Sequence, residues 1–319
     1  MGERPRLSQG IVVDELGKTF GSGRRGSARV DAVAGISFHI EPGERCAFIG
    51  PNGAGKSTSI KMLTGILRPT SGTATVLGLV PWEQRLTLAR RIGTLFGQRS
   101  QLWFQLTPRR TYALLASMYG VPGSDRDARL ASLGELLDAT HLYDRPVRTL
   151  SLGERMRCEL VASLLHEPEI LFLDEPTIGL DLVAKTRFRD LIVRINEEQG
   201  TTIFLTSHDV SDIERVANRV IIINHGRIVF DDSVQMLRQS LLKRKLIGVR
   251  FEEAVPTLRV SGAAVLTHDG AVAQLEVNTE ESPIRSVLDA LLEQYPVADI
   301  SVEDPPLEEI VSHMYERRP

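Results

Sequence analysis

The segment from residue 45 to residue 67 constrains the fold of this chain more than any other. Residues 45–49 form a short apolar run with the length of a buried strand, and a helix is expected from about residue 56 to residue 67. The loop between them is rich in glycine, so its backbone N–H groups can turn inward and surround a phosphate. A strand, such a loop and a helix in this order are typical of phosphate-binding α/β folds. The loop consists of Gly50, Pro51, Asn52, Gly53, Ala54, Gly55, Lys56, Ser57 and Thr58.

The residue types in this loop suit the binding of a nucleoside triphosphate together with Mg²⁺. The N-terminus of the following helix adds a partial positive charge near the phosphates. We expect Lys56 to neutralise the β- and γ-phosphates and Ser57 to offer its hydroxyl to Mg²⁺. The alternative is a chance glycine-rich turn, which the flanking strand and helix disfavour.

An acidic pair follows a second buried strand. Residues 170–173 are all apolar, and Asp174 and Glu175 come directly after them, at the end of the strand where α/β folds bind ligands. We expect Asp174 to bind Mg²⁺ and Glu175 to hold the attacking water as general base. On its own, this pattern equally fits a strand that ends in a solvated acidic turn.

The apolar pattern alternates between strands and helices along most of the chain. Such alternation predicts an α/β fold with a mainly parallel sheet and crossover helices. Residues 98–166 instead show helical spacing and predict a helical subdomain. Strands are expected at 11–20, 33–40, 45–49, 92–96, 170–173, 202–206, 219–224 and 228–230, and helices at 56–67, 112–119, 126–139, 152–166, 182–198 and 210–217.

The region after residue 245 reads as a small C-terminal accessory α+β domain, 246–319. A helix beginning near Ser233 ends in the basic run of residues 243–245, which predicts a boundary. No catalytic constellation follows, since His268 and His313 stand alone. Dimer stabilisation or regulation is expected of this domain by analogy only. Strands are expected at 247–251, 263–267, 271–277 and 297–302, and helices at 283–295 and 307–315.

Composition excludes several classes of protein. The 319 residues are 42% apolar and carry a net charge of −3, which is ordinary for a cytosolic globular protein and argues against a generic nucleic-acid binder. Cys46 and Cys158 each lie in an apolar run, so buried reduced thiols are expected. No apolar run approaches the roughly 18 residues that cross a bilayer, and the N-terminus does not resemble a signal peptide. A membrane role would therefore act through a partner.

A further motif makes the resemblance to a family specific. Residues 150–154, ahead of Asp174 in the sequence, resemble the LSGGQ signature of ABC ATPases, with Leu152 in place of the first glycine and Glu154 in place of glutamine. In that family this motif contacts the γ-phosphate of the ATP held by a partner subunit. The resemblance implies that Ser151, Gly153 and Glu154 bind ATP across a dimer, with the role of Glu154 left open.

The remaining motifs of the family follow in order. Gln98 resembles the Q-loop glutamine, which touches Mg²⁺ and the water, and His208 resembles the switch histidine. Residues 178–181 resemble the D-loop, which assigns Asp181 to the ATP site. Phe20 is a candidate to stack on adenine, although an aromatic residue at a strand end is more often part of a core. The resemblance implies an ABC ATP-binding domain over residues 10–242, with an antiparallel β subdomain beside the helical one.

Two stretches resemble ABC-2-type exporter ATPases near the drug and viologen exporters. They are FGQ-x-x-QLW at residues 96–103 and LSLGE-R-M-R at residues 150–157, and residues 302–310 resemble the end of those subunits. This implies an ATPase homodimer that powers export through separate ABC-2-type permease subunits at the cytoplasmic face of the cell membrane, without nucleic acid. An importer ATPase with a regulatory C-terminal domain and a non-transport ABC ATPase remain alternatives. The permease is expected to dock on an apolar patch of Leu102, Trp103, Phe104 and Leu106, which alternatively pack the helical subdomain.

Overall fold

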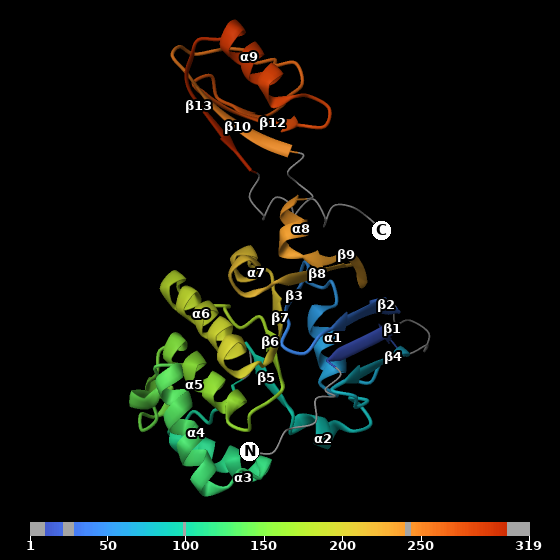
Figure 1. Cartoon of the computed structure of the whole chain (residues 1–319), viewed down its shortest axis with the longest axis vertical. Coiled ribbons are helices and arrows are strands. Elements are labelled where there is room, and N and C mark those ends of the chain that lie inside the picture. The colour runs from blue at the N-terminus through green and yellow to red at the C-terminus, as the bar shows by residue number, and fades with distance from the viewer. Residues whose placement is uncertain (1–9, 22–28, 98–99, 240–243, 305–319) are drawn as a thin grey trace. The chain divides into compact units, whose positions relative to one another are not determined.

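The computed structural model describes residues 10–21, 29–97, 100–239 and 244–304 (Figure 1). The chain divides between Asp232 and Ser233 into two compact units, which are described separately below. Gln98, the predicted helix 307–315 and the end of the predicted 246–319 domain lie outside the described residues. The predicted domain boundaries at residues 242 and 246 stay predictions.

The first unit is built around a six-stranded sheet. In spatial order its strands are β5 (Ile92–Phe96), β6 (Ile170–Asp174), β7 (Thr202–Ser207), β3 (Arg45–Ile49), β8 (Arg219–Asn224) and β9 (Arg227–Ser233). The first five strands in this order run parallel, so the carboxyl ends of β3, β6 and β7 meet at one edge. The turn His225–Gly226 connects β8 and β9, and both residues have positive φ, as a two-residue hairpin turn requires.

The two faces of this sheet are covered by different layers because successive side chains of a strand point to opposite sides. Leu171 and Leu173 of β6 pack into one core with α5 (Leu152–Leu164) and α6 (Leu182–Gln199). Ile170 and Phe172, on the opposite face, pack into a second core with α1 (Lys56–Leu63) and an antiparallel sheet. The buried apolar residues of β6 are therefore divided between two cores.

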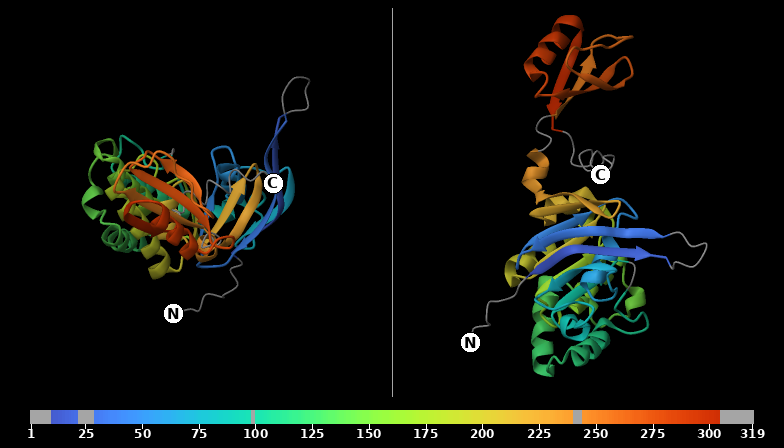
Figure 2. Two further views of the ribbon diagram at one scale, coloured as in Figure 1. Left: turned by 90° about the horizontal axis from the view of Figure 1, so that it is seen from above. Right: turned by 90° about the vertical axis from the view of Figure 1, so that its right-hand side faces the viewer.

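The antiparallel sheet has three strands, in the order β2-β1-β4. β1 (Ile11–Phe20) and β2 (Val30–Ile40) form a long ribbon beside the central sheet (Figure 2), and β4 (Ser71–Val76) pairs with β1 along its other edge. The ring of Phe38 on β2 lies 5.8 Å from that of Phe48 on β3, which joins this sheet to the central one. The short helix α2 (Arg85–Ala89) follows β4.

The helical subdomain consists of α3 (Pro108–Tyr119), α4 (Gly123–Leu136) and α5, with two short 3₁₀ turns, Thr140–Leu142 and Val147–Thr149, before α5. α3 begins at a proline, whose fixed φ suits the first turn of a helix. The buried rings of Tyr112 and Tyr143 meet edge to face 5.2 Å apart, and the Tyr112 hydroxyl donates to the Cys158 carbonyl. Cys158 is buried and free, and burial raises the pKa of its thiol to about 11.

The second unit is a four-stranded antiparallel sheet with one helix on it. Its core includes Ile247, Phe251 and Leu275 from the sheet and Val287 and Leu291 from the helix. The sheet has the order β11-β12-β10-β13, and the elements are α8 (Val234–Gln239), β10 (Arg244–Phe251), β11 (Ala264–His268), β12 (Val272–Asn278), α9 (Ile284–Gln294) and β13 (Val297–Glu303). Over the described parts of both units, no helix combines the length and the apolar character needed to cross a membrane.

Candidate active site

The phosphate-binding loop is a tight turn whose shape depends on glycine. Gly53 and Gly55 have φ of 83° and 112°, and Gly55 caps the N-terminus of α1 without a side-chain cap. A Cβ at Gly50 would lie 2.2 Å from the Ile223 carbonyl oxygen, and one at Gly55 would lie 2.5 Å from that of Ala32. The loop is therefore pressed against β8 and β2, and the first N–H groups of α1 have no side-chain acceptor at the cap.

Lys56 is held inside this loop. Only 6% of the residue is exposed, and Nζ donates to the carbonyl oxygens of Gly50 at 2.6 Å and Pro51 at 3.3 Å. The same Nζ lies 3.5 Å from Glu175 Oε1. The ammonium group is thus fixed between the loop and the end of β6.

Asp174 and Ser57 meet at the edge of the sheet. Ser57 Oγ donates to Asp174 Oδ1 at 3.1 Å, and Thr206 Oγ1 on the neighbouring strand β7 donates to the same oxygen at 2.6 Å. A hydroxyl and a carboxylate are hard oxygen donors of the kind that Mg²⁺ prefers. Sequence reasoning missed Thr206, because a threonine inside a buried strand has no distinguishing pattern.

Glu175 lies between Lys56 and His208. Its Oε2 is 2.7 Å from His208 Nδ1, and its backbone N–H donates to Thr206 through both the hydroxyl and the carbonyl oxygen, each at 3.1 Å. The φ of Glu175 is 51°, a left-handed conformation that non-glycine residues seldom adopt. The carboxylate is largely buried while the imidazole is exposed, so one edge of this pair faces solvent.

The signature residues surround a different cleft. Ser151 caps α5: its Oγ accepts from the Glu154 N–H at 3.2 Å, and Glu154 Oε2 accepts from the Ser151 N–H at 2.8 Å. Glu154 Oε1 also accepts from Arg145 at 2.8 Å. The Ser151 N–H, followed by Arg145, lowers the pKa of the Glu154 carboxyl. The sequence alone did not reveal this capping role of Glu154.

Asp181 lies on the other side of that cleft, which has a volume of about 470 Å³. Its side chain accepts from the Ala184 N–H at 2.8 Å and thereby caps α6. Ser151, Gly153 and Glu154 line the cleft with Asp181, and none of the described residues of the phosphate loop does. The residues predicted to bind ATP thus form two groups on this chain.

Phe20 is exposed, and the predicted apolar patch is exposed only in part. Phe20 ends β1 with 44% of its surface exposed, so it does not belong to the core, and Lys18 Nζ lies 5.4 Å from its ring centre. Trp103 and Phe104 are exposed, with the Arg155 guanidinium 5.4 Å above the Phe104 ring. Leu102 is buried, so it packs in the helical subdomain, as the alternative interpretation held.

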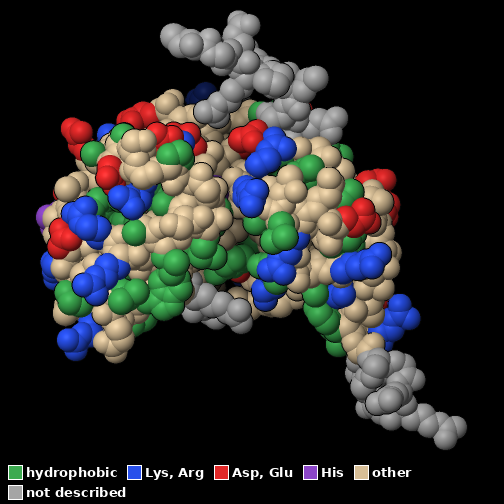
Figure 3. Space-filling model, turned by 90° about the horizontal axis from the view of Figure 1, so that it is seen from below, with side chains coloured by type: hydrophobic (Ala, Val, Ile, Leu, Met, Phe, Trp, Pro, Cys, Tyr) green, Lys and Arg blue, Asp and Glu red, His purple; other side chains and the backbone are tan. Residues whose placement is uncertain are grey.

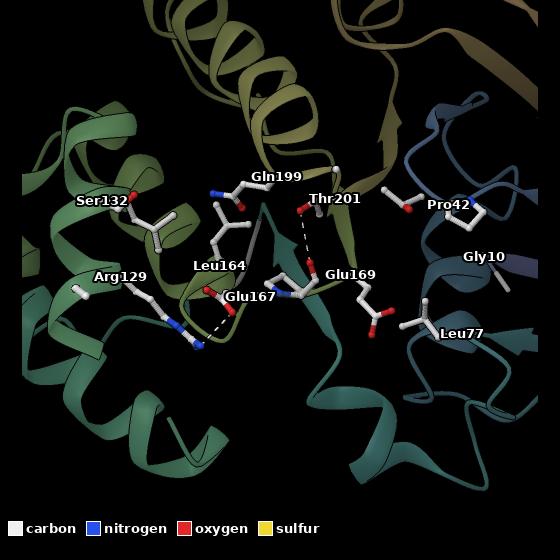
Figure 4. Close-up of a pocket in the computed structure, with 15 residues that line it drawn as sticks. Gly10, Pro42, Leu77, Arg129, Ser132, Leu164, Glu167, Glu169, Gln199 and Thr201 are labelled. Atoms are coloured by element: carbon white, nitrogen blue, oxygen red, sulfur yellow. Dashed lines mark hydrogen bonds and ion pairs between the residues drawn. The ribbon is translucent and has the colours of Figure 1, made fainter. Parts of the chain in front are cut away.

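A further cavity, of about 540 Å³, lies at the amino ends of the parallel strands (Figure 4). Glu169 precedes β6 and Thr201 precedes β7, whereas Asp174 ends β6 and His208 follows β7 at the opposite edge. Arg129 pairs with Glu167 at 3.0 Å, as the dashed line in Figure 4 marks. None of the predicted site residues lines this cavity.

Comparison with known proteins agrees with this geometry. Residues 33–178 match the family described as ABC transporter, and residues 243–303 match the EvrA-like ABC transporter C-terminal domain. The fluoroquinolones export ATP-binding protein of Mycobacterium tuberculosis is 37% identical over 74% of this chain and 75% of its own length. The methionine import ATP-binding protein MetN of Latilactobacillus sakei is 29% identical over 95% of this chain and 89% of its own length.

A solved structure confirms the predicted fold class. The structure of cbiO1 from Clostridium perfringens, described as part of the ABC transporter complex cbiONQ, is 26% identical and superposes with a TM-score of 0.62. It covers 73% of this chain, which covers 94% of it in turn. The phosphate loop, the acidic end of β6 and these relatives together show that the chain belongs to the family of ABC transporter ATP-binding subunits, which are ATPases that use ATP with Mg²⁺.

Proposed function

We propose that this ATPase powers export of drug-like or amphipathic compounds through separate ABC-2-type permease subunits at the cytoplasmic face of the cell membrane. The resemblance at residues 96–103 and 150–157 supports this direction of transport. So does the 37% identity to a protein named for fluoroquinolones export. Transported substrate, permease type and location are parts of this proposal.

The assignment of chemical roles rests mainly on the contact of 2.7 Å between Glu175 and His208. Glu175 is the general base that takes a proton from the attacking water, and His208 orients that carboxylate at the exposed side. Lys56 neutralises the β- and γ-phosphates. Ser57 and Asp174 hold Mg²⁺, which neutralises charge on the phosphate oxygens when bound. Gln98 contacts Mg²⁺ and the water, by resemblance to the family.

A second copy of the chain completes each ATP site in this proposal. Ser151, Gly153, Glu154 and Asp181 line a cleft apart from the phosphate loop and serve the ATP of the partner, while Phe20 stacks on adenine. Exposed apolar residues beside that cleft support an interface with the second copy; these are Ile178, Leu182 and Val183. A twofold pairing gives two equivalent sites, and bound ATP shifts the population toward the closed dimer.

The substitution Glu175→Gln tests the chemical assignment. It removes the base and keeps the size of the side chain, so ATP hydrolysis is expected to stop while ATP binding remains. ATP should then convert the variant to a dimer, measured by light scattering after size-exclusion chromatography. Hydrolysis by Glu175→Gln at the wild-type rate would show that another group is the base.

The permease is proposed to dock beside the segment that follows β5. The face in Figure 3 is hollowed along its middle, and hydrophobic side chains gather around the hollow. Exposed apolar residues near the segment after β5 in the sequence are Trp103 and Phe104 before α3, Leu114 and Met118 on α3, and Leu86 on α2. Co-purification of the tagged chain with a membrane permease tests this docking site. The substitution Trp103→Ser should weaken binding of the permease without lowering the affinity for ATP.

Import is the second candidate, favoured by the match to MetN over 95% of this chain, which includes the C-terminal unit. A permease that co-purifies together with a substrate-binding protein would favour import. A permease without one would favour export. Recovery of the chain only from the soluble fraction, bound to ribosomes, would favour the third candidate, a non-transport ATPase.

A further inference from the structure

A buried ionic network lies next to His208, and none of the proposed catalytic steps uses it. Asp212 of α7 (Val210–Val216) is fully buried and Arg189 of α6 is 6% exposed, with Arg189 Nε donating to Asp212 Oδ1 at 2.6 Å. Arg189 Nη2 and Lys185 Nζ both donate to Asp209 Oδ2, at 3.0 and 2.7 Å. Two cations of α6 therefore bind two carboxylates at the beginning of α7.

The same network binds side chains next to each member of the catalytic pair. Asp212 Oδ2 accepts from Ser207 Oγ at 2.5 Å and from Thr177 Oγ1 at 2.9 Å. Ser207 and Asp209 are the two neighbours of His208, and Thr177 lies two residues after Glu175. Asp212 thus connects the segment that carries the histidine to the turn that carries the glutamate.

The energetics favour a positioning role over a contribution to stability alone. The attraction within a buried ion pair offsets the cost of removing the charges from water only where their other donors and acceptors are also hydrogen-bonded. The presence of such a pair is therefore weak evidence that it stabilises the fold. Asp212 satisfies this condition with one guanidinium and two hydroxyl donors. A side chain with three directional partners restricts the geometry of the groups around it more than an apolar residue would.

We infer that Asp212, together with Arg189, is a positioning unit that holds Glu175 and His208 at hydrogen-bonding distance for ATP hydrolysis. The inference rests on the proposed roles of those two residues. Asp212 touches neither of them and acts through Thr177 and Ser207. Because Arg189 lies on α6, which Asp181 caps, the unit also ties the pair to the helix that borders the signature cleft.

The substitution Asp212→Asn removes the charge that faces Arg189 and leaves the size of the side chain unchanged. We expect kcat for ATP hydrolysis to fall by about tenfold or more, since small displacements of catalytic groups have effects of this order. The Kd for ATP should stay within about twofold, because the phosphate loop is not touched. Equal losses in kcat and in ATP affinity would overturn the inference, since they indicate a general structural role.

Thr177→Val is a milder variant that decides the question if Asp212→Asn fails to fold. It removes one hydroxyl donor to Asp212 and should lower kcat in the same direction. Thr111→Val is its matched control, because the buried Thr111 hydroxyl has no hydrogen-bond partner among the described residues. Asp190→Asn is the control for the charge: Asp190 pairs with Arg215 at 2.8 Å and also joins α6 to α7, but at the exposed surface. Both controls should keep the wild-type kcat.

Combining Asp212→Asn with His208→Ala separates positioning from an independent effect. If Asp212 acts through the pair, the double variant should hydrolyse ATP no more slowly than His208→Ala alone. Additive losses would overturn the inference. Full activity of Glu175→Gln would instead overturn the proposed catalytic roles, whereas an inactive Glu175→Gln beside fully active Asp212→Asn and Thr177→Val would overturn only the positioning unit.

Discussion

At the scale of single residues, Glu154 is a signature residue that also stabilises the helix on which it lies. Glu154→Ala removes the acceptor for the Ser151 N–H and the partner of Arg145, and we expect a loss of about 1 kcal/mol in the free energy of unfolding. Glu154→Gln keeps an amide oxygen for the cap and should lose less. Urea denaturation measures both, and equal losses would contradict the capping role.

The same carboxyl predicts a dependence on pH. Its pKa in the folded chain is lowered from the ordinary value of 4.5, chiefly by the Ser151 N–H, so its ionised form stabilises the fold. That stabilisation is complete above the ordinary pKa and is lost as the pH falls through the lowered folded value. The difference in unfolding free energy between the wild type and Glu154→Gln should therefore be constant near neutral pH and shrink in acid.

Several site residues could be predicted individually because each follows a strand or a glycine-rich turn. Lys56, Asp174 and His208 are of this kind, and their order along the chain identified the family. Thr206 and Asp212 could not be predicted, because each has an ordinary place in a buried strand or an amphipathic helix. The contacts of Thr206 with Asp174, and of Asp212 with Arg189 and Thr177, join residues more than 20 positions apart.

At the scale of elements, α5 carries a second carboxyl with the opposite behaviour. Glu159 is buried and accepts from Ser100 Oγ and the Gln101 N–H, which ties the helix to the segment after β5. Burial is the largest cause of its shift and raises its pKa. Its contribution to stability is complete below the unfolded pKa and is lost as the pH rises through the folded value.

Glu159→Gln should therefore gain stability relative to the wild type as the pH rises through the folded pKa of Glu159. Thermal unfolding at several pH values measures this, with Glu154→Gln on the same helix as the comparison. The two variants should differ from the wild type with slopes of opposite sign against pH. Parallel slopes would contradict the burial of Glu159 as the cause.

Elements with a clear apolar period were predicted, and those without one were missed. β4 reads Ser-Gly-Thr-Ala-Thr-Val and has only two buried side chains, because it is the outer strand of its sheet. The helix α2 has five residues, too few to display a period. Helix α3 begins at Pro108 and not at the predicted residue 112, because its first turn is polar.

At the scale of the whole molecule, the C-terminal unit has a core of its own. Residues 244–304, expressed alone, should unfold cooperatively on heating and give a dispersed NMR spectrum, because α9 and the four strands bury their apolar side chains against one another. A fragment without a cooperative transition would mean that its core depends on the first unit. Deleting residues 246–319 tests whether this region stabilises the dimer or regulates the ATPase. Unchanged dimerisation and an unchanged ATPase rate would contradict both roles.

The turn between β8 and β9 joins the phosphate loop to the strand that leads into the second unit. The Gly226 N–H donates to the Ala54 carbonyl in the phosphate loop at 3.0 Å, and the Gly226 carbonyl accepts from the Ala34 N–H at 2.8 Å. β9 leaves this turn and ends at Ser233, where the second unit begins. A force applied along the chain at Ser233 would therefore act on the strand that starts at the turn bracing the phosphate loop.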